Sequence, residues 1–287
     1  MVLGILFAIG SAFSSGIERI LRKYVLIKED TVCYGFLFGF FAFIGLLPLF
    51  IFKFQLPSNS YAWFLVGISG LLWTLYSLLT FKAYTYLEAS IASSISRIKL
   101  FFVLIMSVIF LGESFTFEKF VGTFLIFLGV FIISFLSNGN NKMSSVNKKG
   151  IILIFISSFV ISITLLIDKY AMNFFNVETY TAPVYLITPL VLLIFVMKKK
   201  DHVKSIIKRN FIPTVLASLL SAGYFYLILY AFKYAEASVV IPIVELSTLI
   251  TVVGGIIFLK ERTYIAHKIV ASLLLIAGAV ILSGKVF

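Results

Sequence analysis

The chain has 287 residues, of which 61% are hydrophobic and 13% are charged, with a formal net charge of +12. Soluble domains carry about twice that charged fraction, and a soluble fold could not keep this much apolar surface away from water. The composition therefore excludes an ordinary soluble enzyme and indicates an integral, multi-pass membrane protein. A bilayer-spanning helix needs about 20 apolar residues, so the chain has room for about ten spans and little else.

Apolar runs of this length occur ten times along the chain. The first has no basic segment before it, so we interpret it as a span and not as a cleaved signal peptide. The predicted spans are 2–22, 31–52, 61–83, 88–112, 115–136, 149–171, 178–197, 211–233, 236–259 and 263–284. The two clearly polar connections are Ser137 to Lys149 and Lys198 to Asn210.

The first polar connection divides the chain nearly in half, and the halves share sequence. Tyr86–Ser90 (YLEAS) recurs as Tyr234–Ser238 (YAEAS), and Phe110–Glu113 (FLGE) recurs as Phe258–Glu261 (FLKE). Both pairs have the same offset, so chance similarity between apolar helices is the weaker explanation. We predict a first repeat over 1–136, a polar linker over 137–148 and a second repeat over 149–287. Five helices per repeat give the second the opposite orientation in the membrane, as in many alternating-access transporters.

These repeats resemble the drug/metabolite transporter superfamily in its ten-helix, EamA-type form, over essentially the whole chain. The resemblance also includes the steps Gly112-Glu113 and Lys260-Glu261, and the small residues of the helices that follow: Gly122, Gly129, Ala271 and Gly278. It implies a secondary transporter of amino acids, other metabolites, drugs or nucleotide sugars, and it does not name the solute.

Partners and location follow from the same features. The basic residues lie mostly in short loops, where they set topology and contact anionic lipid headgroups, so we do not expect nucleic-acid binding. Their distribution predicts both termini outside the cell, whereas the resemblance favours both inside. We expect a plasma-membrane location, and a monomer, because the duplication removes the need for a dimer. A proton or other ion is a candidate for coupling to transport.

Cofactor and metal sites have little support. The single cysteine, Cys33, excludes an intrachain disulfide and multi-cysteine zinc sites, and the two histidines lie in or near loops. No Walker-type nucleotide-binding loop is present, so we expect no cofactor and no ATP-driven pumping by this chain.

Charges deep in spans are costly and mark functional or pairing sites. Arg97 and Glu245 occupy equivalent positions of the two repeats, each nine residues beyond a glutamate at the start of its span. That depth is roughly half the bilayer core, so both charges should lie near the midplane. They would form an ion pair, line the substrate path, or do both. Lys99 should point to the opposite side of a continuous helix, toward a neighbouring helix or a crevice.

Other residues are candidates for the same site. Pro242 removes a helical hydrogen bond three residues before Glu245, giving a packing kink or a hinge; Ser93 is a milder candidate in the matching helix. Trp73 lies on the same aromatic helix as Tyr76 and is a further candidate, with an interfacial belt or helix packing as the alternative. The equivalent pair Tyr76 and Tyr224 are too deep for an interfacial belt, and we expect them to pack between helices or to line the cavity.

Charged residues near span ends have a simpler interpretation. Glu18 and Arg22 form an i,i+4 pair, and we expect them and Asp168 to extend to the interface. Glu88, Glu113, Glu236 and Glu261 should be structural or gating. The arginine and glutamate together suit a zwitterion, so the first hypothesis is transport of an amino acid. Organic cations, drugs and phosphorylated metabolites are alternatives within transport, and a membrane-embedded enzyme or a channel are alternatives outside it.

Overall fold

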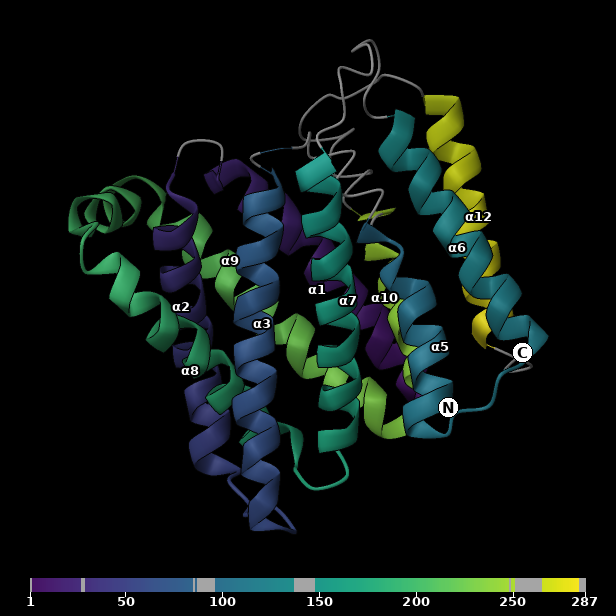
Figure 1. The fold of residues 1–287 in the computed structure, drawn as a ribbon, viewed down its shortest axis with the longest axis horizontal. Coiled ribbons are helices and arrows are strands. Elements are labelled where there is room, and N and C mark those ends of the chain that lie inside the picture. Colours follow the sequence, from purple (N-terminus) through teal and green to yellow (C-terminus); the bar gives the residue numbers. More distant parts are fainter. Residues whose placement is uncertain are drawn as a thin grey trace.

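The computed structural model describes residues 2–26, 29–84, 86, 96–136, 148–247, 249–250 and 265–283. Within these ranges the chain is helical and has no strand (Figure 1). The elements are α1 (Val2–Leu26), α2 (Thr31–Phe52), η1 (Ser60–Ala62), α3 (Trp63–Tyr84), α5 (Lys99–Leu111), α6 (Phe117–Leu136), α7 (Lys148–Ala171), α8 (Val177–Val196), α9 (Lys200–Tyr234), α10 (Ala237–Val244) and α12 (Ile265–Ser283).

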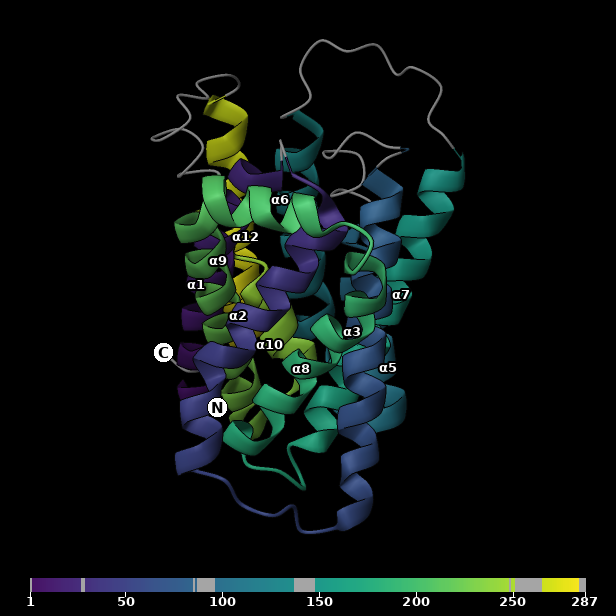
Figure 2. The same ribbon diagram turned by 90° about the vertical axis from the view of Figure 1, so that its left-hand side faces the viewer.

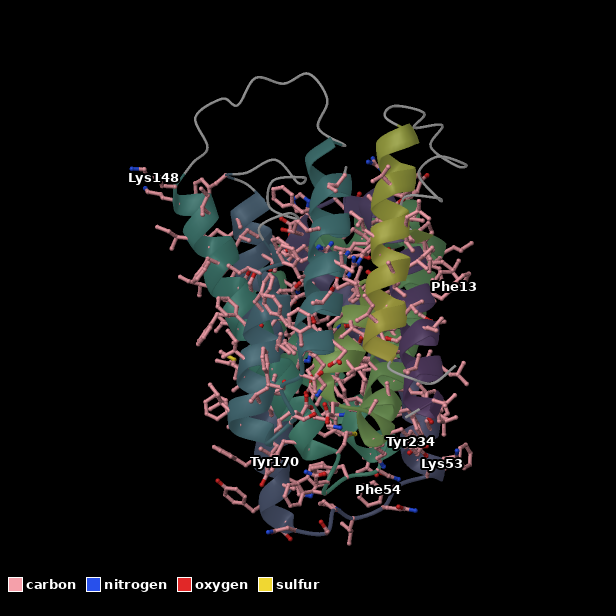
Figure 3. The ribbon with its side chains drawn as sticks, turned by 90° about the vertical axis from the view of Figure 1, so that its right-hand side faces the viewer. Phe13, Lys53, Phe54, Lys148, Tyr170 and Tyr234 are labelled. Carbon is pink, nitrogen blue, oxygen red and sulfur yellow. The ribbon has the colours of Figure 1, made fainter. Side chains whose placement is uncertain are left out.

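Six of the described helical segments are long and apolar enough to cross a membrane. Large apolar side chains cover the outside of the bundle, and Phe13, which is 58% exposed, projects from it at mid-height (Figure 3). Lys53, Tyr170 and Tyr234 lie near one end, and Lys148 lies at the other (Figure 3). Apolar residues around the middle with tyrosine and lysine at the ends match a helical bundle in a bilayer.

Each predicted span corresponds to a described helix, with three differences in extent. The first is α9, which begins at Lys200, so part of the predicted loop 198–210 is helical. Its backbone departs from helical angles at Asn210 (φ −131°, ψ 29°), and the first turns run across one end of the bundle (Figure 2). Ile206 is buried there while the charged side chains stay exposed, which explains why a charged segment still forms a helix.

This crossing segment is attached to the connection between α1 and α2. Asp30 caps α2 by accepting hydrogen bonds of 3.0 Å from the backbone N–H groups of Val32 and Cys33. Its other carboxylate oxygen lies 2.7 Å from Nζ of Lys199. Partial burial opposes ionisation, but the bonds from Lys199 and Cys33 outweigh it and hold the pKa of Asp30 at about 2.

The other two differences are turns within the predicted spans 88–112 and 236–259, of which residues 88–95, 248 and 251–259 lie outside the described part. Arg97 and Ile98 form a turn, and α5 begins only at Lys99. The helix α10 ends at Val244, two residues after Pro242, and Glu245 and Leu246 form a turn. Pro242 cannot donate a backbone hydrogen bond, which favours the end of the helix here. Both deep charges therefore lie at helix ends and not inside continuous helices.

Helices pack in pairs that combine the two halves of the sequence. The main contacts join α1 to α9, α3 to α7, α2 to α8, and α6 to α12. The last pair lies side by side at one edge of the bundle (Figure 1). A Cβ atom added at Gly278 would lie 2.7 Å from the carbonyl oxygen of Gly122, and one added at Gly122 would lie 2.9 Å from that of Gly278. Such close backbone approach requires small residues, as is usual between membrane helices.

Candidate functional site

A cavity of about 170 Å³ lies among the helices of both halves. This volume is below the roughly 300–1,000 Å³ of pockets for drug-sized ligands, so the cavity suits a small solute. Its ionisable walls are Glu18, Arg19 and Arg22 of α1 and Lys99 of α5. Its other polar and aromatic walls include Ser15, Tyr34, Trp73, Thr74, Tyr76, Ser77, Tyr185, Thr188, Ser221 and Tyr224.

Behind the cavity wall, Glu245 is the centre of a cluster of charges. Its carboxylate forms an ion pair with Arg97 and lies 2.7 Å from Nζ of Lys99. A guanidinium nitrogen of Arg19 is 3.9 Å away. Glu245 is 2% exposed and Arg97 is 6% exposed. Buried charges of this kind persist only when they are paired, and here one carboxylate has three cationic neighbours.

The structure brings Lys99 and Arg97 to the same carboxylate, so the prediction that they point apart is wrong. That prediction assumed a continuous helix through both residues. Because Arg97 belongs to the turn that precedes α5, its side chain does not follow the helical rotation. The turn is supported by α7, whose Ser158 and Ser162 hydroxyls donate to the carbonyls of Ser96 and Lys99 at 3.3 Å. Non-helical backbone at membrane depth needs such partners.

A second charged pair lines the cavity. Arg22 Nε lies 3.3 Å from Oε1 of Glu18, which confirms the predicted i,i+4 pair. Glu18 is only 6% exposed, so the expectation that it extends to the interface is wrong. Beside this pair, the hydroxyl of Tyr34 is buried and has no hydrogen-bond partner among the described residues, although the residue lines the cavity. A buried hydroxyl without a partner is costly.

Four cationic side chains therefore share two carboxylates around the cavity. The cations are Arg19, Arg22, Arg97 and Lys99, and the carboxylates are Glu18 and Glu245. Arg19 was not predicted as a site residue, because it lies beside Glu18 near a span end. The predicted deep charges were two cations, Arg97 and Lys99, and one anion, Glu245. The charged residues Glu18, Arg19 and Arg22 at the end of the first apolar run could therefore have been considered as further members of the site.

The predicted aromatic residues reach the cavity. Trp73, Tyr76 and Tyr224 all line it, two from α3 and one from α9. Pro242 is buried in α10 and is not among the cavity-lining residues of the described part, nor are Arg97 and Glu245. Ser93 lies outside the described residues. The structure thus separates the predicted site residues into a wall and a buried ion cluster, with Lys99 belonging to both.

Asp168 is the second carboxylate whose predicted place is wrong. It is 0% exposed, and its oxygens accept hydrogen bonds from Ser69 Oγ, from Tyr180 OH at 2.7 Å and from Trp73 Nε1 at 3.0 Å. It follows a long apolar run, so only its distance from the end of α7 suggested an interfacial position. The donors that bury it come from α3 and α8 and have no distinctive sequence pattern.

Glu113, predicted to be structural or gating, holds the start of α10. Its carboxylate accepts from the backbone N–H groups of Ala237 at 2.6 Å and Ser238 at 3.0 Å, and from Ser238 Oγ at 2.6 Å. The first backbone N–H groups of a helix lack internal partners and favour negative charge. Glu236 forms an ion pair with Lys119, whereas Glu88 and Glu261 lie outside the described residues.

No group of three or more His, Cys, Asp or Glu side chains within the described ranges is arranged to hold a metal ion.

Sequence comparison identifies the family. The sequence model of the EamA-like transporter family matches residues 2–135 and 148–284. The chain belongs to the EamA-like transporter family. It is therefore an integral, multi-pass membrane protein of a transporter family, and the resemblance stated from the sequence is confirmed.

Individual relatives agree with this assignment. The chain is 26% identical to a WAT1-related protein of Arabidopsis thaliana over 270 residues, which cover 88% of this chain and 78% of that protein. It is 32% identical over 119 residues to an uncharacterized transporter of Archaeoglobus fulgidus, over 42% of this chain and 40% of the relative. A crystal structure with 11% sequence identity shares the fold, with a TM-score of 0.79 over 97% of this chain and 95% of that one.

Proposed function

We propose that this family member is a secondary transporter that moves a small carboxylate-bearing solute through the cavity. The observation that carries the proposal is the charge of the cavity wall, where Arg19, Arg22 and Lys99 outnumber the one carboxylate among the described lining residues, that of Glu18. Arginine and lysine bind carboxylates through charge-assisted hydrogen bonds. An organic cation would meet a positive field, so this alternative is weaker.

An amino acid remains the first solute class within this proposal. Glu245 is engaged by Arg97 and Lys99, so it is poorly placed to receive an ammonium group. Glu18 lines the cavity, as does Tyr34, and its carboxylate is the better acceptor for the ammonium group. A zwitterion would place its carboxylate toward Arg19 and Lys99 and its ammonium toward Glu18. Phosphorylated metabolites would use the same cations, and ligand-induced stabilisation separates the two solute classes.

We also propose that the two halves are inverted repeats that alternate around this cavity. The family model matches the two halves separately. If α1, α2, α3 and α6 are exchanged with α7, α8, α9 and α12, the α1–α9 contact becomes the α3–α7 contact. The α2–α8 and α6–α12 contacts are each unchanged by this exchange. This pairing is what a two-fold axis between the repeats would produce, and transporters built in this way bind their solute at the repeat interface. The protein would act as a monomer in the plasma membrane.

Ligand-induced stabilisation tests the solute class. Purified protein in detergent is heated with amino acids, dicarboxylates, phosphorylated metabolites and organic cations, because a bound ligand raises apparent stability with the logarithm of its concentration. The proposal expects stabilisation by carboxylate-bearing solutes, loss of that effect in Arg19→Met and no loss in Lys198→Met, which removes an exposed loop charge. Stabilisation by organic cations alone, or an unchanged effect in Arg19→Met, would contradict it.

A further inference from the structure

Asp168 is a fully buried carboxylate without a basic partner among the described residues. Among the residues that the structure describes, its charge is compensated by three neutral donors, the hydroxyls of Ser69 and Tyr180 and the indole N–H of Trp73. A carboxylate bonded to neutral donors is easier to protonate than one paired with arginine. When it becomes neutral, no buried positive charge is left without a partner.

Several ionisable groups on the helices around Asp168 have contacts elsewhere, and Tyr76 of α3 packs its ring against that of Trp73. Lys169 donates to the backbone carbonyls of Phe232 and Ala235, and Lys99 of α5 contacts Glu245. On α8, Glu178 accepts from Tyr226 and Tyr230 of α9, and Tyr185 bonds Ser221 of α9. The residues of α10 between Ala237 and Val244 are not ionisable. Tyr180 is thus the one titratable side chain bonded to Asp168 in the described part of the chain.

The two oxygens of Asp168 differ in what they can accommodate. Oδ1 accepts from Ser69 and Tyr180, whose hydroxyls can rotate and accept a hydrogen bond instead. Oδ2 accepts from Trp73, whose indole N–H can only donate. A proton is therefore best placed on Oδ1. Protonation would change the hydrogen bond from Trp73 to Oδ2 from a charge-assisted bond to a neutral one, which is roughly half as strong.

We propose that Asp168 is the binding site of a coupling proton. One proton adds reversibly to Oδ1, the carboxylate becomes a neutral carboxyl, and the indole of Trp73 is held less tightly. Trp73 lines the cavity and lies on α3, whereas Asp168 lies on α7 of the other half. Protonation thereby acts on the cavity wall and on the contact between halves. The coupling role rests on the proposed transport function, whereas the proton binding does not.

Tryptophan fluorescence tests proton binding without any knowledge of the solute. The chain has two tryptophans, so Trp63→Phe leaves Trp73 as the only indole. Its emission is measured from about pH 4 to pH 9 in detergent, a range that covers perturbed carboxyl groups. We expect a reversible, single-site transition with unchanged helicity, which disappears in Trp63→Phe/Asp168→Asn. The matched carboxylate variant Trp63→Phe/Glu178→Gln should keep it.

Two results would overturn proton binding: a flat profile in Trp63→Phe, or a transition that persists after Asp168→Asn. If the Asn variant does not fold, infrared difference spectra of the Trp63→Phe protein decide the matter, since a protonated carboxyl must appear over the same pH range. Coupling is then measured in proteoliposomes containing a pH dye, with amino acids as the probe. Wild type should move protons with the solute, and Asp168→Asn should exchange solute without them. Proton movement retained in Asp168→Asn would contradict the coupling role.

Discussion

Arg97 and Glu245 form a buried ion pair between the turn that precedes α5 and the turn that follows α10. They occupy equivalent positions of the two proposed repeats, so under that proposal the pair joins the halves at corresponding points. Glu245 also contacts Lys99 and Arg19, so it is the shared partner of three cations, whereas each cation contacts one carboxylate of this cluster.

Replacing Glu245 should therefore cost more than replacing any one cation. Glu245→Gln leaves three cations without their carboxylate and should lower the free energy of unfolding by about 3–5 kcal/mol. Arg97→Met leaves Glu245 with Lys99 and Arg19 and should cost less. Thermal unfolding in detergent measures both, with Asp201→Asn as an exposed carboxylate control. A larger loss in Arg97→Met than in Glu245→Gln would contradict this account of the cluster.

The contact from Glu113 to the start of α10 predicts a coupled pair. Glu113→Ala removes the acceptor of all three hydrogen bonds donated by Ala237 and Ser238 and should cost about 1–3 kcal/mol, because buried N–H groups lose their partner. Ser238→Ala removes one of the three bonds. The double variant should lose less stability than the two single losses combined. Simple additivity in this double-mutant cycle would show that the two side chains act independently.

The α6–α12 contact predicts a strong dependence on glycine. Gly278→Ala places a methyl group 2.7 Å from both the Gly122 oxygen and Ile126, so the helices must move apart at a cost of about 1–3 kcal/mol. Gly67→Ala is the matched control, since nothing lies within 4 Å of its added Cβ. It should be neutral or stabilising by up to about 1 kcal/mol, because alanine favours a helix. Equal melting temperatures for the two variants would argue against close α6–α12 packing.

Alternating access predicts that a cavity residue is reached from both sides of the membrane. Cys33 is the only cysteine and is buried, so Cys33→Ser gives a cysteine-free background. Adding Ser77→Cys places a thiol in the cavity wall, and adding Tyr61→Cys instead places one at an exposed position of η1, just before α3. Impermeant thiol reagents should label the Ser77→Cys protein from either side, in proportions that change with solute. The Tyr61→Cys protein should be labelled from one side. Labelling of the Ser77→Cys protein from one side under all conditions would contradict alternation.

The sequence predicted features that depend on spacing and hydropathy. Ten apolar runs correspond to ten described helices, and the shared offset of Arg97 and Glu245 identified a pair that the structure brings together. Lys99 was misplaced because a helix was assumed to continue through Arg97, and only tertiary contacts with α7 show that it does not.

Burial was harder to predict than helical position. Glu18 and Asp168 both follow apolar runs near span ends, and hydropathy alone places them at the interface. Asp168 is inside because three donors from α3 and α8 converge on it, which requires the relative positions of the helices. The segment before Asn210 was predicted as a loop from its charge, but one buried face was enough to make it helical.

Solute exchange in proteoliposomes shows directly whether the protein transports a carboxylate-bearing solute. Vesicles containing purified protein are loaded with an unlabelled amino acid or dicarboxylate, and entry of the labelled solute is followed in wild type, Arg19→Met and Lys198→Met. The account predicts saturable exchange of a carboxylate-bearing solute in wild type and Lys198→Met, reduced at least about tenfold in Arg19→Met, the equivalent of one lost interaction of about 1.4 kcal/mol. Folded wild-type protein that exchanges organic cations and no carboxylate-bearing solute would contradict it.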